Sequence, residues 1–166
     1  MSKLAYSKYG APIDNGLTSS NESTLFEAKN MVLWDVPTEL EIGVIPKRIY
    51  CHRDMLPPLR DAFINLIERG FVKELKTWDG CFNVRPIRGY EKKFAAAAKA
   101  GNIELAMSYL SEHSWGLAID VNAAWNRLGM QPTLSIGFVR CFEDAGFVWG
   151  GRWKRLDGMH FELKLF

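Results

Sequence analysis

The sequence predicts a single α+β domain in which a small antiparallel sheet is flanked by helices. Its size is the first observation behind this prediction, because 166 residues, 48% hydrophobic and 13% aromatic, suit one compact core. The second observation is that amphipathic helical segments alternate with short apolar segments of strand-like length. We therefore expect one domain over residues 31–166, preceded by an arm over residues 1–30.

The arm is rich in Ser, Asn, Gly and Thr and has no clear hydrophobic period, which predicts an irregular segment lying over the domain. Residues 31–50 mix short apolar runs with prolines, as edge strands do. The aromatic and apolar side chains that could anchor the arm are Tyr6, Tyr9, Leu25 and Phe26.

A clear helix is predicted over residues 56–71, LPPLRDAFINLIERGF. Two prolines stand at its start and Gly70 at its end, both common at helix ends. One apolar face is formed by Leu59, Phe63, Leu66 and Ile67.

A hairpin is predicted next, with strands over residues 72–78 and 81–89 and a turn at Asp79–Gly80. Residues 90–101 and 102–110 then predict two helical segments, and residues 116–122 (GLAIDVN) a short buried strand. The remaining elements are a helix from an N-cap at Thr133 to Gly146 and a closing strand over 159–166.

The charge balance and the first residues exclude several classes of protein. A formal net charge of +2 predicts no nucleic-acid partner. The first residues lack the apolar core of a signal peptide, and no run approaches the roughly 18–20 apolar residues of a membrane span, so we expect no membrane insertion. Three widely spaced cysteines, none in a C-x-x-C pair, predict reduced and buried thiols.

Two of the three histidines lie near aspartates in short segments that contain glycine. A turn at residues 113–116 followed by a strand would carry Asp120 back beside His113. Asp120 stands among apolar residues, and a buried carboxylate needs a partner, either an arginine or a metal ion. The third histidine, His52, predicts a surface or structural role.

The second segment, DGMHFE, places Asp157 three residues before His160. Two imidazoles and one carboxylate are a common ligand set of catalytic zinc, and a nearby carboxylate outside the ligand set then serves as general base. His113, Asp120 and His160 supply such a set and Asp157 such a base. The alternatives are two hydrogen-bonded core histidines, or Asp157 as the ligand with Asp120 merely structural.

These residues resemble a known family. S-x-H-x-x-G-x-A-x-D at Ser111 to Asp120, followed by D-G-x-H-F-E at Asp157 to Glu162, is similar to the VanY-type D-alanyl-D-alanine carboxypeptidases, zinc peptidases that include phage L-alanyl-D-glutamate endopeptidases. The resemblance covers roughly residues 75–166.

The resemblance implies that His113, Asp120 and His160 bind Zn²⁺ and that Asp157 is the general base. It also implies a substrate-binding arginine in a strand, matched by Arg85 in NVRPIRG, although Val84 replaces the usual aromatic residue and Arg88 is an alternative. Ser111 of the first motif and Trp153, in a Gly-Trp loop, are the expected substrate contacts.

The function that follows is a zinc-dependent peptidase acting on the stem peptide of bacterial peptidoglycan, as a monomeric phage endolysin with L-alanyl-D-glutamate specificity. Together with the missing leader, the resemblance implies synthesis in the host cytoplasm, release by a holin and action on the wall in the periplasm. The alternatives are a D-alanyl-D-alanine carboxypeptidase and a non-enzymatic phage protein that binds the wall or has a structural role.

Overall fold

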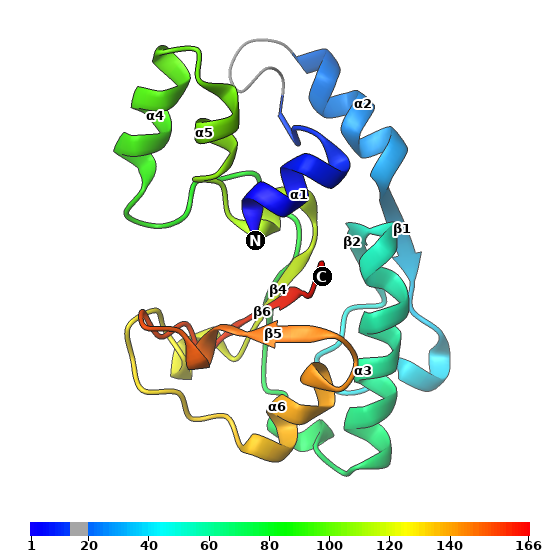
Figure 1. Ribbon diagram of the computed structural model, residues 1–166. Helices are drawn as coiled ribbons and strands as arrows, with labels where there is room; N and C mark the ends of the chain where they lie inside the picture. Colours follow the sequence, from blue (N-terminus) through cyan, green and yellow to red (C-terminus); the bar gives the residue numbers. More distant parts are fainter. Residues whose placement is uncertain (14–19) are drawn as a thin grey trace.

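The structure is a computed structural model that describes residues 1–13 and 20–166, with the backbone alone for residues 20–24. The described residues form an α+β fold with two antiparallel sheets, as the sequence predicts (Figure 1). The α-helices are α1 (Ser2–Tyr9), α2 (Ser20–Asn30), α3 (Leu56–Glu68), α4 (Glu91–Lys99), α5 (Ile103–Met107) and α6 (Ile136–Glu143). The strands are β1 (Met31–Asp35), β2 (Arg48–His52), β3 (Trp78–Gly80), β4 (Ala118–Val121), β5 (Phe147–Trp149) and β6 (His160–Leu163). Short 3-10 helices are η2 (Thr38–Leu40), η3 (Arg53–Met55), η4 (Val72–Glu74), η5 (Glu112–Trp115), η6 (Ala123–Trp125) and η7 (Gly150–Arg152).

The larger sheet has the strand order β3-β4-β6-β5, and its neighbouring strands are antiparallel. The two central strands, β4 and β6, come from segments about 40 residues apart in the chain (118–121 and 160–163). Their register pairs Asp120 with His160 and Ala118 with Glu162. The polar residues of both motifs are therefore neighbours on adjacent strands. The smaller sheet pairs β1 with β2 over residues 31–35 and 48–52.

Helix α6 packs against the larger sheet. In Figure 1, α6 lies below the sheet and α3 to its right, whereas α1, α4 and α5 lie above it. Phe142 of α6 contacts Phe161 of β6 with ring centroids 4.5 Å apart, and Phe138 lies next to both. Because α3 packs directly on α6, its buried face (Leu59, Phe63 and Leu66) contributes to the core, as the helical period predicts, whereas Ile67 of the predicted face is exposed.

The N-terminal arm is not irregular, which corrects the prediction from composition. It forms α1 and α2, while residues 14–19 lie outside the described part. Tertiary contacts stabilise α1: the Tyr9 and His52 rings lie 4.2 Å apart, and the buried Trp115 indole donates to the Gly10 carbonyl oxygen. Packing of this kind supports short helices that show little hydrophobic period. Phe26 is buried as expected, but Leu25 is exposed.

The predicted hairpin at Asp79–Gly80 is also wrong. Both residues belong to β3, which pairs with β4 and not with the segment that follows. The Asp79 carboxylate accepts a hydrogen bond from the backbone N–H of Ala123, which follows the end of β4. The aspartate therefore contacts the β4 segment and does not form a turn. Residues 81–90 contain only an isolated bridge between Pro86 and Leu110. Arg85 consequently lies in an irregular segment and not on a strand.

The start of α6 lies two residues later than predicted. Its N-cap is Ser135, whose Oγ accepts from the Phe138 N–H at 3.1 Å, and Thr133 instead donates its N–H to the Asn126 side chain. The buried Asn126 requires that hydrogen bond, which leaves the capping position to the next hydroxyl along the chain.

Two further predictions concern buried side chains. Cys51, Cys81 and Cys141 are buried and form no disulfide, as predicted. His52 is structural and not on the surface: it is buried, its Nδ1 accepts from the Asp54 N–H, and burial lowers its pKa to about 4.

In the part of the chain that the structure describes, no helix combines the length and the apolar character needed to cross a membrane.

Candidate metal centre

The three predicted ligands come together where η5 meets the centre of the larger sheet. His113 lies on η5, Asp120 on β4 and His160 on β6. One potential ligand atom from each lies within 4.8 Å of the others, and the described residues hold no second such group of histidine, cysteine and acidic side chains. Both histidines are buried and Asp120 is nearly so. The cluster thus has the composition and the spacing of a metal site.

A single turn brings the first two ligands together. Gly116 has a φ of 66°, a left-handed conformation that ends η5 and lets the chain reverse into β4. Asp120 then returns to a position beside His113, as the sequence predicts, with 3.1 Å between His113 Nε2 and Asp120 Oδ2. The β4–β6 register supplies the third ligand, because Asp120 and His160 are direct partners.

The hydrogen bonds of His113 favour a cation between it and Asp120. The His113 Nδ1–H donates to the backbone carbonyl oxygen of Cys81, which can only accept, so in a neutral imidazole Nε2 carries the lone pair. Nε2 is buried and has no hydrogen-bond partner, although it faces the Asp120 carboxylate. Two facing lone pairs repel each other unless a positive charge lies between them. A proton on Nε2 or a metal ion would supply this charge, and an imidazole fixed by a backbone carbonyl is the usual form of a metal ligand.

His160 is held between two carboxylates. Its Nδ1 lies 3.2 Å from Asp120 Oδ1, and its Nε2–H donates to Glu162 Oε2 at 3.2 Å. Burial lowers the pKa of His160, but the two carboxylates outweigh burial and raise it to about 10. Burial raises the pKa of Asp120 while the two histidines lower it, and the net result lies below its ordinary value. With Nε2–H bound to Glu162, Nδ1 is the atom that would face a metal ion.

Asp157 lies beside these ligands, in the loop between η7 and β6. Its backbone N–H donates to the Gly150 carbonyl oxygen, and its own carbonyl accepts from the His160 N–H. The carboxylate oxygen Oδ1 is buried without a hydrogen-bond partner, and burial raises the pKa of Asp157. A carboxylate with a free oxygen and a raised pKa suits a general base. Gly158 is required for close approach, since a Cβ there would lie 2.9 Å from Pro132.

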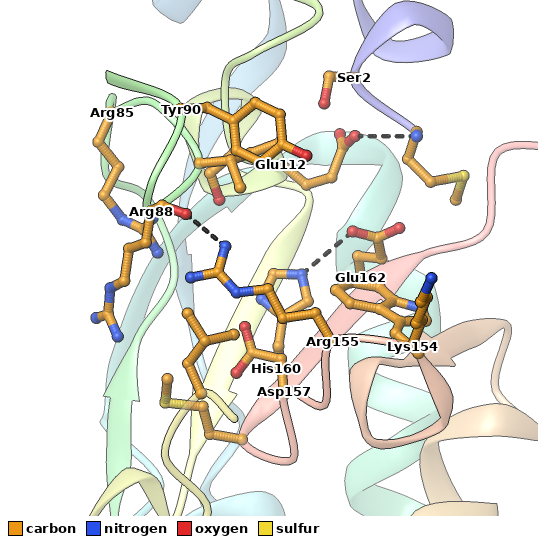
Figure 2. Close-up of a pocket in the computed structure, with 16 residues that line it drawn as sticks. Ser2, Arg85, Arg88, Tyr90, Glu112, Lys154, Arg155, Asp157, His160 and Glu162 are labelled. Atoms are coloured by element: carbon orange, nitrogen blue, oxygen red, sulfur yellow. Dashed lines mark hydrogen bonds and ion pairs between the residues drawn. The ribbon is translucent and has the colours of Figure 1, made fainter. Parts of the chain in front are cut away.

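A pocket of about 520 Å³ opens over His160 and Asp157 (Figure 2). Ser111 and Trp153, the expected substrate contacts, both line it, and the Trp153 ring lies 5.3 Å from the His160 ring. Figure 2 shows Arg85 and Arg88 on one side of the pocket, Glu112 and Glu162 on the other, and the guanidinium of Arg155 between them.

Both candidate arginines line the pocket. Arg85 is half-buried, and Ser114 holds its backbone by accepting from the Arg85 N–H and donating to its carbonyl oxygen, each at 3.1 Å. Arg88 is exposed, and its positive charge opposes the rise in the Asp157 pKa that burial causes. The geometry therefore leaves both arginines available to a bound substrate.

Sequence reasoning missed three charged residues of the pocket, Glu112, Lys154 and Arg155. Arg155 donates from Nη1 to the Arg88 carbonyl oxygen at 2.6 Å, which joins the two loops that form the basic side. Glu112 is buried, and burial with the nearby Glu162 raises its pKa to about 7. Its position within the S-x-H motif was the available signal, but η5 was needed to show that its side chain turns inward.

The fold and the site together define a candidate metal-dependent hydrolytic centre: three clustered potential ligands, of which His160 lines a pocket, beside a carboxylate with a free oxygen. Residues 106–163 match the model of a protein family described as D-alanyl-D-alanine carboxypeptidase. This segment contains all three ligands and Asp157 but not Arg85. Over this segment the chain is similar to a family of zinc-dependent peptidases. No match to the chain was found among the curated proteins or among the solved structures.

Proposed function

We propose that the protein is a zinc-dependent peptidase that cleaves the stem peptide of bacterial peptidoglycan. The observation that carries this proposal is the arrangement of His113 and Asp120, in which a buried imidazole nitrogen faces a carboxylate and a metal ion between them would remove the repulsion of their lone pairs. The two residues lie in the segment that matches the carboxypeptidase family. His113 Nε2, Asp120 and His160 Nδ1 would hold Zn²⁺, with the Cys81 carbonyl and Glu162 orienting the two imidazoles.

Bound zinc would polarise the scissile carbonyl and lower the pKa of water at the site. Asp157 takes the proton from the attacking water, for which its unpartnered Oδ1 is available. The protonated Asp157 then gives the proton to the departing amine, which regenerates the carboxylate. Its raised pKa favours the first step, because it makes the carboxylate a better base.

The basic side of the pocket stabilises the negative charge that develops on the carbonyl oxygen. Arg85 is the expected donor, and Arg88 is the alternative because it lines the same pocket. Trp153 presents an aromatic ring beside His160, against which an extended peptide can pack. Ser111 offers a hydroxyl at the pocket wall.

For the bond, we infer cleavage between L-alanine and D-glutamate by a monomeric phage endolysin. Such an enzyme would be made in the host cytoplasm and act on the wall in the periplasm after a holin releases it. The support is the resemblance of both motifs to phage endopeptidases together with the +2 net charge, which does not hinder approach to an anionic wall. The second candidate is a D-alanyl-D-alanine carboxypeptidase, which the description of the matching family favours.

Digestion of purified peptidoglycan, with and without a chelator, tests the proposal. We expect soluble fragments without the chelator and none with it, and activity should return when zinc is added in excess. Mass analysis identifies the bond, because a new L-alanine carboxyl terminus indicates the endopeptidase and free D-alanine the carboxypeptidase. His113→Ala is the matched control and should be inactive in every condition. Digestion that persists in the chelator, or no digestion with zinc present, would contradict the proposal.

A further inference from the structure

The pocket contains a pair of buried acidic side chains that the proposed reaction does not use for proton transfer. Glu112 and Glu162 are 5% and 6% exposed, and both line the pocket. Glu112 comes from η5 and Glu162 from β6. Figure 2 shows both carboxylates on the side of the pocket away from Arg85 and Arg88. The acidic pair thus lies apart from the two arginines, on a side of the pocket that also contains Lys154 and the Met1 amino group (Figure 2).

Of the two carboxylates, that of Glu162 has a hydrogen-bond partner and that of Glu112 has none. Glu162 accepts from His160 Nε2–H, whereas neither oxygen of Glu112 has a hydrogen-bond partner although both are buried. Within the described residues, the one cation at ion-pair distance from Glu112 is the amino group of Met1, 3.9 Å from Oε1. That separation is longer than a hydrogen bond. Glu112 thus has an unfilled capacity to bind a donor from the pocket.

A buried carboxylate without a donor is costly, and a second carboxylate beside it raises that cost. A positively charged donor entering the pocket would lower the cost for both. Among the described residues, the one cluster of three potential metal ligands is His113, Asp120 and His160. The pair of Glu112 and Glu162 does not belong to such a cluster, which distinguishes it from the metal centre. An organic ammonium needs only such acceptors, because it forms hydrogen bonds and has no fixed coordination number.

We propose that Glu112, together with the neighbouring Glu162, binds a side-chain ammonium group of the peptide substrate. This inference rests on the proposed function and narrows the substrate to stem peptides whose diamino acid has a free amino group. The substrate would lie across the pocket with its carboxylates toward the arginines and its ammonium toward the glutamates. A stem peptide whose amino group is already amide-linked in a cross-link would lose this contact.

Two synthetic peptides test the inference: N-acetyl-L-Ala-γ-D-Glu-L-Lys-D-Ala-D-Ala with the lysine ε-amine either free or acetylated. For the zinc-loaded protein we expect kcat/KM to be about tenfold or more higher with the free amine, as for a hydrogen bond to a charged group. In Glu112→Gln, which keeps the size of the side chain, that ratio should fall close to one. Glu68→Gln, at an exposed position on α3, is the matched control and should keep the ratio.

The outcomes separate this inference from the proposed function. Equal kcat/KM for the two peptides, or an unchanged preference in Glu112→Gln with normal zinc content, overturns the ammonium site while leaving the peptidase intact. The same holds if Glu112→Gln only lowers the melting temperature, which would mean that Glu112 serves to hold Met1. Cleavage of neither peptide counts against the proposed function. Calorimetric binding of both peptides then decides, because only an ammonium site binds the free amine more tightly and loses that difference in Glu112→Gln.

Discussion

At the scale of single residues, the proposed reaction depends most on Asp157, whose free oxygen lies beside the ligands without belonging to the closest group. Replacing it by asparagine keeps the size and most of the hydrogen-bonding capacity but removes the ability to take a proton. We therefore expect Asp157→Asn to fold, to bind zinc with unchanged stoichiometry and to hydrolyse peptidoglycan roughly 10²–10⁴-fold more slowly. Metal analysis and the rate of release of wall fragments measure the two properties separately.

Asp120→Asn provides the contrast, because Asp120 faces both histidines at 3.1 and 3.2 Å. It should lose activity together with zinc. If zinc is lost in Asp157→Asn and kept in Asp120→Asn, the assignment of base and ligand is reversed.

The residue types of the site could be predicted because the chemistry restricts them. The chain has three histidines, and two of them lie near aspartates in short segments that contain glycine. Few combinations of residues could therefore form a histidine-containing metal site. The motif spacing could not reveal Glu112 or Arg155, since their roles depend on which way η5 turns and on how two loops meet. Nor could it rank Arg85 against Arg88, because both reach the same pocket.

At the scale of elements, the turn from η5 into β4 holds the site together. Gly116 combines a φ of 66° with a crowded surrounding, because a Cβ would lie 2.6 Å from the Met31 side chain and 2.9 Å from the backbone nitrogen of His52. That nitrogen donates to the Gly116 carbonyl oxygen, so the backbone cannot move away freely. We expect Gly116→Ala to lower the free energy of unfolding by about 2 kcal/mol or more and to weaken zinc binding.

Gly101→Ala separates the two causes of that loss. Its φ is 70°, but nothing lies within 4 Å of the position of its Cβ. Only the backbone strain of about 1–2 kcal/mol should appear there, with zinc binding unchanged. Urea denaturation of both variants checks the difference, and equal losses would show that crowding around Gly116 has no effect.

Elements that depend on local signals could be predicted, and those that depend on a distant partner could not. The prolines and apolar face of α3 and the short apolar run of β4 agree with the structure. The Asp79–Gly80 pair has the local chemistry of a hairpin turn, but the Ala123 N–H binds Asp79 and draws the segment onto β4. Likewise, α1 forms because Tyr9 and Gly10 contact His52 and Trp115, which lie far away in the sequence.

At the scale of the whole molecule, the metal centre joins segments that the chain connects only over long distances. The first ligand follows the helices above the sheet, and the last lies on the final strand, so a bound ion would connect η5, β4 and β6 directly. In the unfolded chain the ligands are separated and do not form this site. Zinc should therefore bind the folded state preferentially and stabilise it.

We expect free zinc at 100 times its dissociation constant to raise the free energy of unfolding by about 2.7 kcal/mol, and a chelator to remove this increment. Asp120→Asn should lose the increment, since a neutral amide is a poor zinc ligand and no longer offsets the ion's charge, whereas Asp157→Asn should keep it. Thermal unfolding at several zinc concentrations measures the effect without reference to activity. An increment of the same size in Asp120→Asn would place the ion elsewhere. If zinc does not stabilise the unmodified protein, a proton between His113 and Asp120 balances their facing lone pairs instead of a metal ion.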